Sequence, residues 1–200
     1  YTKAGYSNKH DPDPSSCDDD FWTAAERVVK DFVSRILSSN VAPSVIGVHV
    51  DHDGWFYRNG STHDASPSCK EKFGIWLRQR YRDDKVSLRA AWFDGKVDFD
   101  TLSVPALTNG NRGEEFVRIG RSGRRWVDYN LFLSDVTVDR IAQLAYAIKK
   151  ETGGMWLVGA NYGYTFEWSY PASGHLSLGK LLRCPSVDYV TGPSSYKARE

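Results

Sequence analysis

Apolar positions recur along the chain in two spacings, and these predict helices separated by short strands. Apolar residues three and four positions apart mark the helices, because that spacing places them on one helical face. In the first helix this face would carry Trp22, Val29, Phe32 and Ile36 into the core. The predicted helices span, in chain order, residues 19–39, 67–83, 85–92, 127–151 and 175–182.

Three short apolar runs, at 44–50, 155–160 and 187–190, predict strands. The first run is rich in β-branched residues, which suits a parallel strand covered on both faces. Strands that alternate with helices imply parallel βαβ units. No glycine-rich phosphate-binding motif follows any of these runs, so a nucleotide-binding fold is disfavoured. We therefore expect an α/β fold that is a partial (β/α)8 TIM barrel, because these strands are too few to close a barrel.

The chain has 200 residues, of which 40% are hydrophobic and 26% charged, so one domain or a large part of one is expected. Residues 1–18 are polar and predict an irregular N-terminal segment. Residues 93–126 show little periodicity, which is typical of a functional excursion in a compact domain. We expect residues 1–200 to form a single barrel segment that is truncated at both ends.

Charge and cysteine content indicate which classes of partner and which compartment suit the chain. The 26 Lys and Arg nearly balance the 25 Asp and Glu, which gives no electrostatic case for nucleic acid or an anionic membrane. The basic run 118–125 is interpreted as a solvated loop. No stretch approaches the ~18 apolar residues of a membrane span, so a soluble protein is expected. The 3 widely spaced cysteines match neither a zinc pattern nor a disulfide framework, which favours a reducing compartment such as the cytoplasm. No cofactor is expected.

His49, Asp51 and Asp53 stand at every second position where the first predicted strand ends. Such side chains share one face of a strand, and α/β proteins bind ligands at the carboxyl ends of parallel strands. Asp53 is the candidate proton donor, or else it caps the turn at Gly54. Asp51 would position a sugar hydroxyl or pair with Arg58. His49 would bind a hydroxyl or lie in the core, and the triplet could instead hold a divalent metal.

The other two predicted strands also end in polar and aromatic residues. Flat aromatic rings beside polar groups suit sugar rings, and 14% of the residues are aromatic. Glu167 is a second candidate catalytic carboxylate, or else an exposed loop acid. The remaining candidate substrate-binding residues at strand ends are Trp55, Asn161, Tyr162, Tyr164, Ser195 and Tyr196.

Several sequence blocks occur in a characteristic order between residues 19 and 199. They are Val45-Ile46-Gly47-Val48-His49-Val50, Trp55-Phe56, Phe73-x-x-Trp76-Leu77-x-x-Arg80-Tyr81, Leu88-x-x-Ala91-Trp92, Val127-Asp128-Tyr129-x-x-Phe132, Gly159-Ala160-Asn161-Tyr162-Gly163-Tyr164, Ser173-Gly174-His175-Leu176 and Val187-Asp188-Tyr189-x-x-Gly192-Pro193-x-Ser195-Tyr196. This order resembles the fourth-strand region, and the stretch C-terminal to it, of glycoside hydrolase family 42-like β-galactosidases.

The resemblance implies a (β/α)8 barrel of which this chain supplies roughly strands four to six. Such enzymes cleave glycosidic bonds with retention, using a Glu acid/base after strand four and a Glu nucleophile after strand seven, about 5–5.5 Å apart. This chain departs from the pattern, because Asp53 stands where the acid/base Glu is expected and no Glu lies between Glu26 and Glu71. The nucleophile would lie beyond residue 200.

The sequence therefore predicts a glycoside hydrolase-like barrel, a glycosidase if it is active, that acts on a β-linked sugar such as a galactoside. The missing strand-four Glu motivates the alternative of a carbohydrate-binding barrel without catalysis. A metal-dependent hydrolase built on His49, Asp51 and Asp53 is a third hypothesis. The expected partners are a carbohydrate substrate and the remainder of the barrel. Without that remainder, open strand edges predict self-association of the chain.

Overall fold

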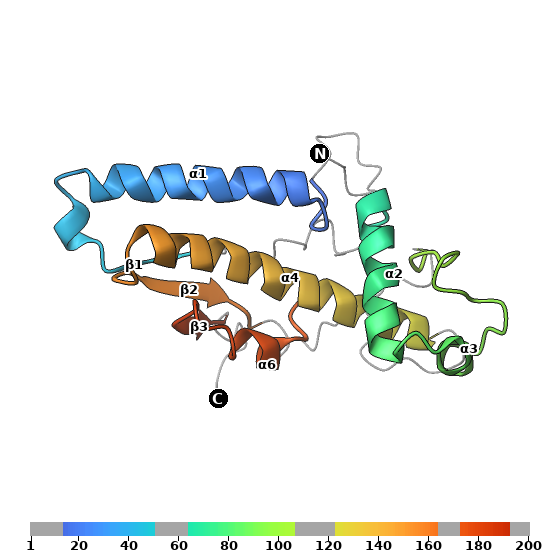
Figure 1. Cartoon of the computed structure of the whole chain (residues 1–200). Helices are drawn as coiled ribbons and strands as arrows, with labels where there is room; N and C mark the ends of the chain where they lie inside the picture. The colour runs from blue at the N-terminus through green and yellow to red at the C-terminus, as the bar shows by residue number, and fades with distance from the viewer. Residues whose placement is uncertain (1–13, 51–63, 107–122, 164–172, 193–200) are drawn as a thin grey trace, which may run out of the picture.

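A computed structural model defines residues 14–50, 64–106, 123–163 and 173–192, which are coloured in Figure 1. Three strands alternate with helices, as the sequence predicts. The helices are α1 (Asp19–Leu37), α2 (Pro67–Tyr81), α3 (Lys85–Trp92), α4 (Gly123–Glu151) and α6 (Leu178–Leu181), with a 3-10 turn at Ala42–Ser44, and the strands are β1 (Gly47–His49), β2 (Leu157–Asn161) and β3 (Tyr189–Thr191).

Local sequence signals set the helix ends. The Asp18 carboxylate accepts a hydrogen bond from the Phe21 amide, 2.9 Å away, and so caps α1. The Ser66 hydroxyl does the same for α2, which has its proline in the first turn. The helix α4 ends before Gly153 and Gly154, whose φ angles of 58° and 81° lie in the left-handed region that favours glycine. Local capping residues therefore account for the starts of α1 and α2 and for the end of α4.

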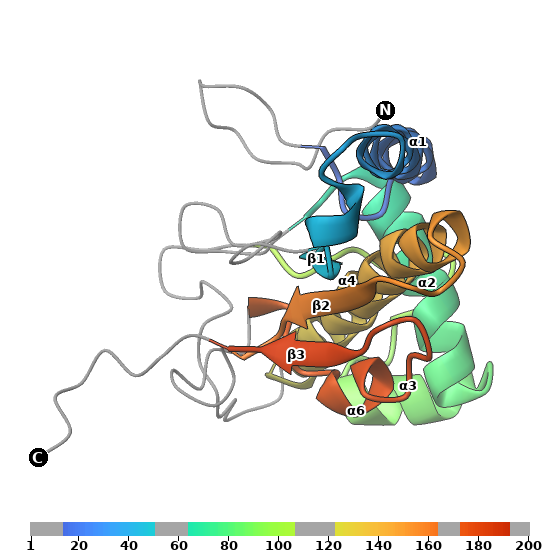
Figure 2. The same cartoon turned by 90° about the vertical axis from the view of Figure 1, so that its left-hand side faces the viewer.

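The three strands form one parallel sheet in the order β1-β2-β3. In register, Gly47 of β1 lies beside Leu157 of β2, and Gly159 of β2 lies beside Tyr189 of β3. A side chain at Gly47 would overlap the Leu157 carbonyl, so the close approach of β1 to β2 requires a glycine there. Figure 2 shows all three strands pointing to the same side of the molecule.

Helices α1 and α4 cover one face of the sheet. Val33 of α1 and Ile148 of α4 pack with Val158 of β2 in one buried cluster. The alternation of side chains places Leu157 and Tyr189 on the opposite face, where they are 48% and 40% exposed. The prediction that the first strand is covered on both faces is therefore wrong for the described residues, because the helices that pack against the sheet, α1, α4 and α6, lie on one side of it.

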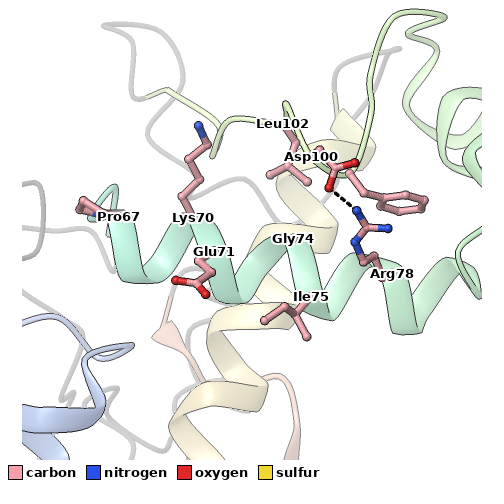
Figure 3. A pocket seen from close by; sticks show the side chains of 9 residues that line it. Pro67, Lys70, Glu71, Gly74, Ile75, Arg78, Asp100 and Leu102 are labelled. Carbon is pink, nitrogen blue, oxygen red and sulfur yellow. Dashed lines mark hydrogen bonds and ion pairs between the residues drawn. The ribbon is translucent and has the colours of Figure 1, made fainter.

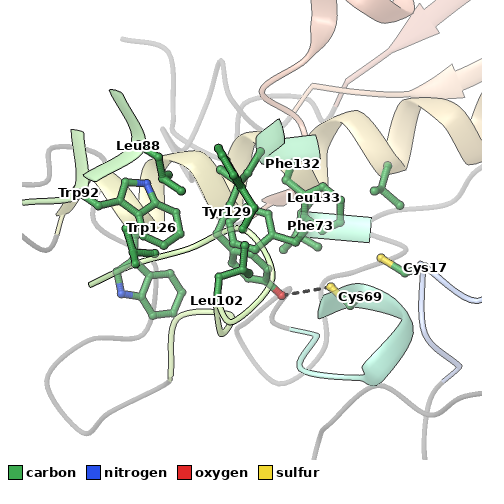
Figure 4. Packing of buried hydrophobic residues seen from close by; sticks show 14 residues of the cluster. Cys17, Cys69, Phe73, Leu88, Trp92, Leu102, Trp126, Tyr129, Phe132 and Leu133 are labelled. Carbon is green, nitrogen blue, oxygen red and sulfur yellow. Dashed lines mark hydrogen bonds between the residues drawn. The ribbon is translucent and has the colours of Figure 1, made fainter. Parts of the chain in front are cut away.

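A separate aromatic core lies between α2, α3 and the N-terminal half of α4 (Figure 4). Phe73 stacks on Trp92 and meets Tyr129 edge to face, the two arrangements that aromatic pairs prefer, while Phe132 is tilted against Phe73 and Tyr129. Its largest buried side chains are Phe73, Leu77, Leu88, Trp92, Trp126, Tyr129, Phe132 and Leu133.

Two sequence predictions need correction. Phe32 is 56% exposed, because the stripe of α1 that meets α4 follows Val29, Val33 and Ile36 and leaves Phe32 beside it. The predicted helix at 175–182 is a single turn, α6. Before it, the Leu176 amide donates to the Ser134 hydroxyl (3.1 Å) and so binds this segment to α4.

No helix of the described residues is long and apolar enough to cross a membrane. The α/β class, with parallel strands alternating with helices, is confirmed. Closure into an eight-stranded barrel stays a prediction.

Candidate functional site

The carboxyl ends of β1, β2 and β3 meet at one edge of the sheet (Figure 2). Parallel pairing brings them together although β1 and β3 are separated by more than a hundred residues of chain. Side chains of His49, Asn161 and Thr191, the last residue of each strand, gather at this edge. In α/β proteins this edge is where ligands bind, so it is the candidate site.

His49 and Thr191 are joined by a hydrogen bond of 2.9 Å between Nε2 and Oγ1. Both side chains are exposed on the open face of the sheet. The Tyr189 ring lies over Gly159 on the same face, and its centroid is 6.1 Å from that of His49. The open face therefore carries an imidazole, a hydroxyl and an aromatic ring side by side.

Asn161 and Tyr162, both predicted to bind substrate, point in opposite directions. Asn161 belongs to the open face, where it lies beside Thr191 in register, and it is 7% exposed. Tyr162 is fully buried on the helix side, with its ring stacked on His175 at 4.4 Å. Its hydroxyl accepts from the Ser177 amide (2.9 Å), and burial raises the pKa of Tyr162. The described contacts of Tyr162 are structural, and its contact with a substrate stays a prediction.

The other predicted site residues lie outside the described residues. The structure therefore tests neither their positions nor their roles, and it gives no distance between the two candidate carboxylates. They are the candidate catalytic residues Asp53 and Glu167, and the candidate substrate-binding residues Asp51, Trp55, Tyr164, Ser195 and Tyr196.

A buried cluster that sequence analysis missed joins the segment before α1 to the start of α2. The Cys17 and Cys69 thiols and the Asp64 carboxylate lie within 4.8 Å of one another, and all three residues are buried. Asp64 accepts hydrogen bonds from the Ser15 hydroxyl (2.6 Å) and the Ser66 amide (2.9 Å). Cysteines so far apart in sequence give no spacing signal, which is why the cluster could not be predicted.

Two thiols and a carboxylate are ligands that zinc accepts. Burial raises the pKa of the Cys69 thiol well above its ordinary value, so a metal would have to displace a tightly held proton. The Asp64 backbone is also tied to α4, because the Tyr129 hydroxyl donates to its carbonyl (2.6 Å) and accepts from its amide (3.0 Å). With its hydrogen bonds satisfied in this way, the cluster holds three segments together.

A groove of about 380 Å³ lies between α2 and the segment around Asp100 (Figure 3). One of its polar groups, the Arg78 guanidinium, pairs with Asp83 (2.9 Å) and with Asp100. The same guanidinium lies over the Phe99 ring, 5.1 Å from its centroid. None of the lining residues comes from the sheet, so this groove is separate from the strand-end site.

Comparisons with known proteins identify the fold. The sequence matches no protein-family profile and no curated protein sequence. The structure is similar to a polyextremophilic β-galactosidase from the Antarctic haloarchaeon Halorubrum lacusprofundi, with a TM-score of 0.68 and 21% identity over 94% of this chain and 25% of that one. It is also similar to a β-galactosidase from the psychrophilic Marinomonas ef1, with a TM-score of 0.65 and 17% identity over 94% of this chain and 26% of that one.

At this identity the likeness establishes the fold alone. The chain spans about a quarter of the length of these two β-galactosidases. Its α/β arrangement is thus that of a part of each, which agrees with the expectation of a barrel segment.

Proposed function

We propose that β1, β2 and β3 are roughly strands four to six of a (β/α)8 barrel. The strand order supports this, since each strand pairs in parallel with the next one along the chain. A doubly wound sheet would reverse its strand order and carry helices on both faces. The described helices cover one face, and the other presents Leu157 and Tyr189, as the inner face of an incomplete barrel would.

The activity that this arrangement supports best is hydrolysis, with retention, of a β-linked sugar such as a galactoside. The observation that carries the proposal is that three strand ends meet at one edge, in a fold shared with part of two β-galactosidases. Asp53, which follows β1, is the proposed acid/base, and Glu167, which follows β2, is the alternative candidate for that acid role. The proposed sugar-binding residues are His49, Asp51, Trp55, Asn161, Tyr164, Ser195 and Tyr196. A sugar contact by Tyr162 would require its buried ring to leave His175.

In this mechanism the acid/base protonates the glycosidic oxygen while a second carboxylate, about 5–5.5 Å away, attacks the anomeric carbon. The deprotonated acid/base then activates water, which hydrolyses the glycosyl-enzyme. An Asp at position 53 is one methylene shorter than a Glu, so its backbone must lie closer to the leaving oxygen for proton transfer. The nucleophile is proposed to lie outside the 200-residue chain.

The test is Asp53→Asn in a longer protein that contains this chain, assayed on two β-galactosides. Loss of the proton donor should slow hydrolysis of an alkyl galactoside by about 10²–10⁴-fold. An aryl galactoside with a very good leaving group needs little protonation and should lose much less. Asp139→Asn is the matched control, since this carboxylate is 62% exposed on α4. Equal losses on both substrates would reject Asp53 as the acid. If the wild-type protein hydrolyses neither substrate, the hypothesis that it is a glycosidase is rejected.

Carbohydrate binding without catalysis is the second candidate. The observation that favours it is the Asp at position 53, where the resembling enzymes have a Glu. This hypothesis predicts that the longer protein binds galactosides in a calorimetric titration and does not hydrolyse even the activated aryl substrate. Hydrolysis that disappears in a variant of the nucleophile would exclude it.

A further inference from the structure

The hydrogen bond between His49 and Thr191 links the two outer strands of the sheet across the middle one. In register, His49 lies beside Gly159, and Gly159 lies beside Tyr189, so Thr191 is two residues nearer the carboxyl end of β3. The His49 side chain thus leans along the sheet to reach the Thr191 hydroxyl at 2.9 Å. It spans β2 on the open face, at the edge where all three strands end.

Glycine at position 159 makes room for the Tyr189 ring beside this hydrogen bond. A Cβ at Gly159 would overlap the Tyr189 ring, which occupies the space above the β2 backbone. The His49 ring is a neighbour of the Tyr189 ring, tilted by 56° to it with 6.1 Å between centroids. Any other residue at 159 would displace the Tyr189 ring, which is the aromatic neighbour of His49 on this face.

We propose that His49 and Thr191 are positioning residues, which hold the carboxyl ends of β1 and β3 at a fixed separation for the proposed glycosidase reaction. This inference rests on the proposed function. Asp53 follows His49 by four residues, and Ser195 follows Thr191 by four. The two segments that carry proposed site residues therefore start from strand ends that share one hydrogen bond.

Loss of the hydrogen bond between His49 and Thr191 should affect the rate through the placement of the reacting groups. Reacting groups must be held close to the productive arrangement, and a misplacement of 1 Å can cost about 10²-fold in rate. The hydrogen bond itself lies on an exposed face, so its loss should change the stability of the fold little. A large effect on kcat with a small effect on stability is what separates positioning from a structural role.

The test uses two pairs of variants in a longer protein that contains this chain. Thr191→Val removes the hydroxyl at constant shape, and Thr191→Ser restores it. His49→Leu removes the ring nitrogen, and His49→Gln places an amide nitrogen at a similar reach. We expect Thr191→Val and His49→Leu to lower kcat by up to about 10²-fold, with the thermal midpoint little changed in both and KM little changed in Thr191→Val. Thr191→Ser and His49→Gln should recover most of the rate.

A spectroscopic measurement checks the hydrogen bond independently of activity. In protein labelled with 15N-histidine, the Nε2 resonance of His49, assigned by its loss in His49→Gln, should shift in Thr191→Val and stay in place in Thr191→Ser. Equal kcat in Thr191→Val and Thr191→Ser, or an unshifted resonance, would overturn the positioning role while leaving the glycosidase proposal intact. A wild-type protein that hydrolyses no β-galactoside would overturn both, even if the resonance reported the bond.

Discussion

The two ends of α4 meet very different neighbours (Figure 1). The N-terminal half is enclosed by α2 and α3, where Phe73, Trp92 and Tyr129 are buried. The C-terminal half lies between α1 and a sheet whose other face is open. At the N-terminal end the aromatic cluster is buried within this chain, although Val86 of α3 is itself 73% exposed. At the other end Leu157 and Ile46, on the sheet and just before it, are 48% and 78% exposed.

The polar contacts of the two ends differ in the same way. At the aromatic end the fully buried Asp128 carboxylate accepts from Arg80 (3.0 Å), Tyr81 (2.6 Å), Trp92 (2.9 Å) and Arg124 (3.1 Å). These donors come from α2, α3 and α4, so one carboxylate ties three helices. A buried charge is tolerated when it is so fully paired.

At the sheet end the hydrogen bond that crosses the sheet, between His49 and Thr191, is exposed. The aromatic end is therefore a closed hydrophobic core with its buried charge fully paired. The sheet end exposes polar side chains on its open face. Stability and candidate function are thus divided between the two halves of α4. Substitutions at the aromatic end should act on unfolding, and those on the open face should act on association or activity.

The largest expected effect is that of Asp128→Ala. Removal of this carboxylate leaves four donors without their shared acceptor, and the free energy of unfolding should fall by roughly 3 kcal/mol. The value lies at the low end for a buried ion pair because Arg80 and Arg124 are 34% and 42% exposed and can regain water. Urea unfolding followed by tryptophan fluorescence measures it.

Asp139→Ala is the control for this prediction. Its carboxylate pairs with Lys180 at 2.7 Å but is 62% exposed, so the loss should be below about 1 kcal/mol. Similar losses for Asp128→Ala and Asp139→Ala would show that the aromatic end does not depend on its buried carboxylate.

The second prediction concerns how the free energy of unfolding depends on pH through Tyr129. Its hydroxyl is buried, and desolvation raises its pKa well above the ordinary value of about 10. Above pH ~10 the unfolded chain releases this proton first, so stability is retained below that pH and falls as pH rises. One such proton contributes a slope of up to about 1.4 kcal/mol per pH unit. Tyr129→Phe should remove that share of the decline, measured as unfolding free energies in urea between pH ~8 and ~11.

The control for the pH prediction is Tyr146→Phe, because Tyr146 is 62% exposed on the same helix. It should leave the slope unchanged. Tyr129→Phe also loses the hydrogen bonds to Asp64, which lowers stability at every pH without changing the slope. A slope that is the same in Tyr129→Phe and wild type would contradict the role of the buried hydroxyl.

The helices are the part of the fold that sequence predicts best. Helical spacing and the caps at Ser66 and Gly153 predict α2, α3 and α4 to within a few residues, since these signals are local. The strand ends at His49 and Asn161 are predicted because parallel strands finish at one edge.

The features that sequence could not predict depend on distant contacts. The Cys17 and Cys69 cluster and the His49 contact with Thr191 join residues with no spacing signal between them. The exposure of Phe32 depends on which stripe of α1 the helix α4 covers. Those choices are made by tertiary packing, which no local pattern encodes.

The smallest expected change in stability belongs to Leu157→Lys, on the open face of β2. In the 200-residue chain this side chain is 48% exposed, so the free energy of unfolding should change by no more than about 0.5 kcal/mol. Self-association should nevertheless weaken, since a charge would stand on the apolar face that a second copy would cover. Sedimentation velocity over a concentration series measures the monomer fraction, which should rise.

Val86→Lys is the matched control for Leu157→Lys, because Val86 is 73% exposed on α3, at the aromatic end, and the charge added is the same. It should leave association unchanged if the sheet face is the contact. In a longer protein whose further strands cover that face, Leu157→Lys should instead lower the free energy of unfolding strongly, since the ammonium would then be buried without a partner. Val86→Lys should stay neutral there. If Leu157→Lys stays neutral in the longer protein, the open face is not the interior of a barrel, and the division between the two ends of α4 needs another cause.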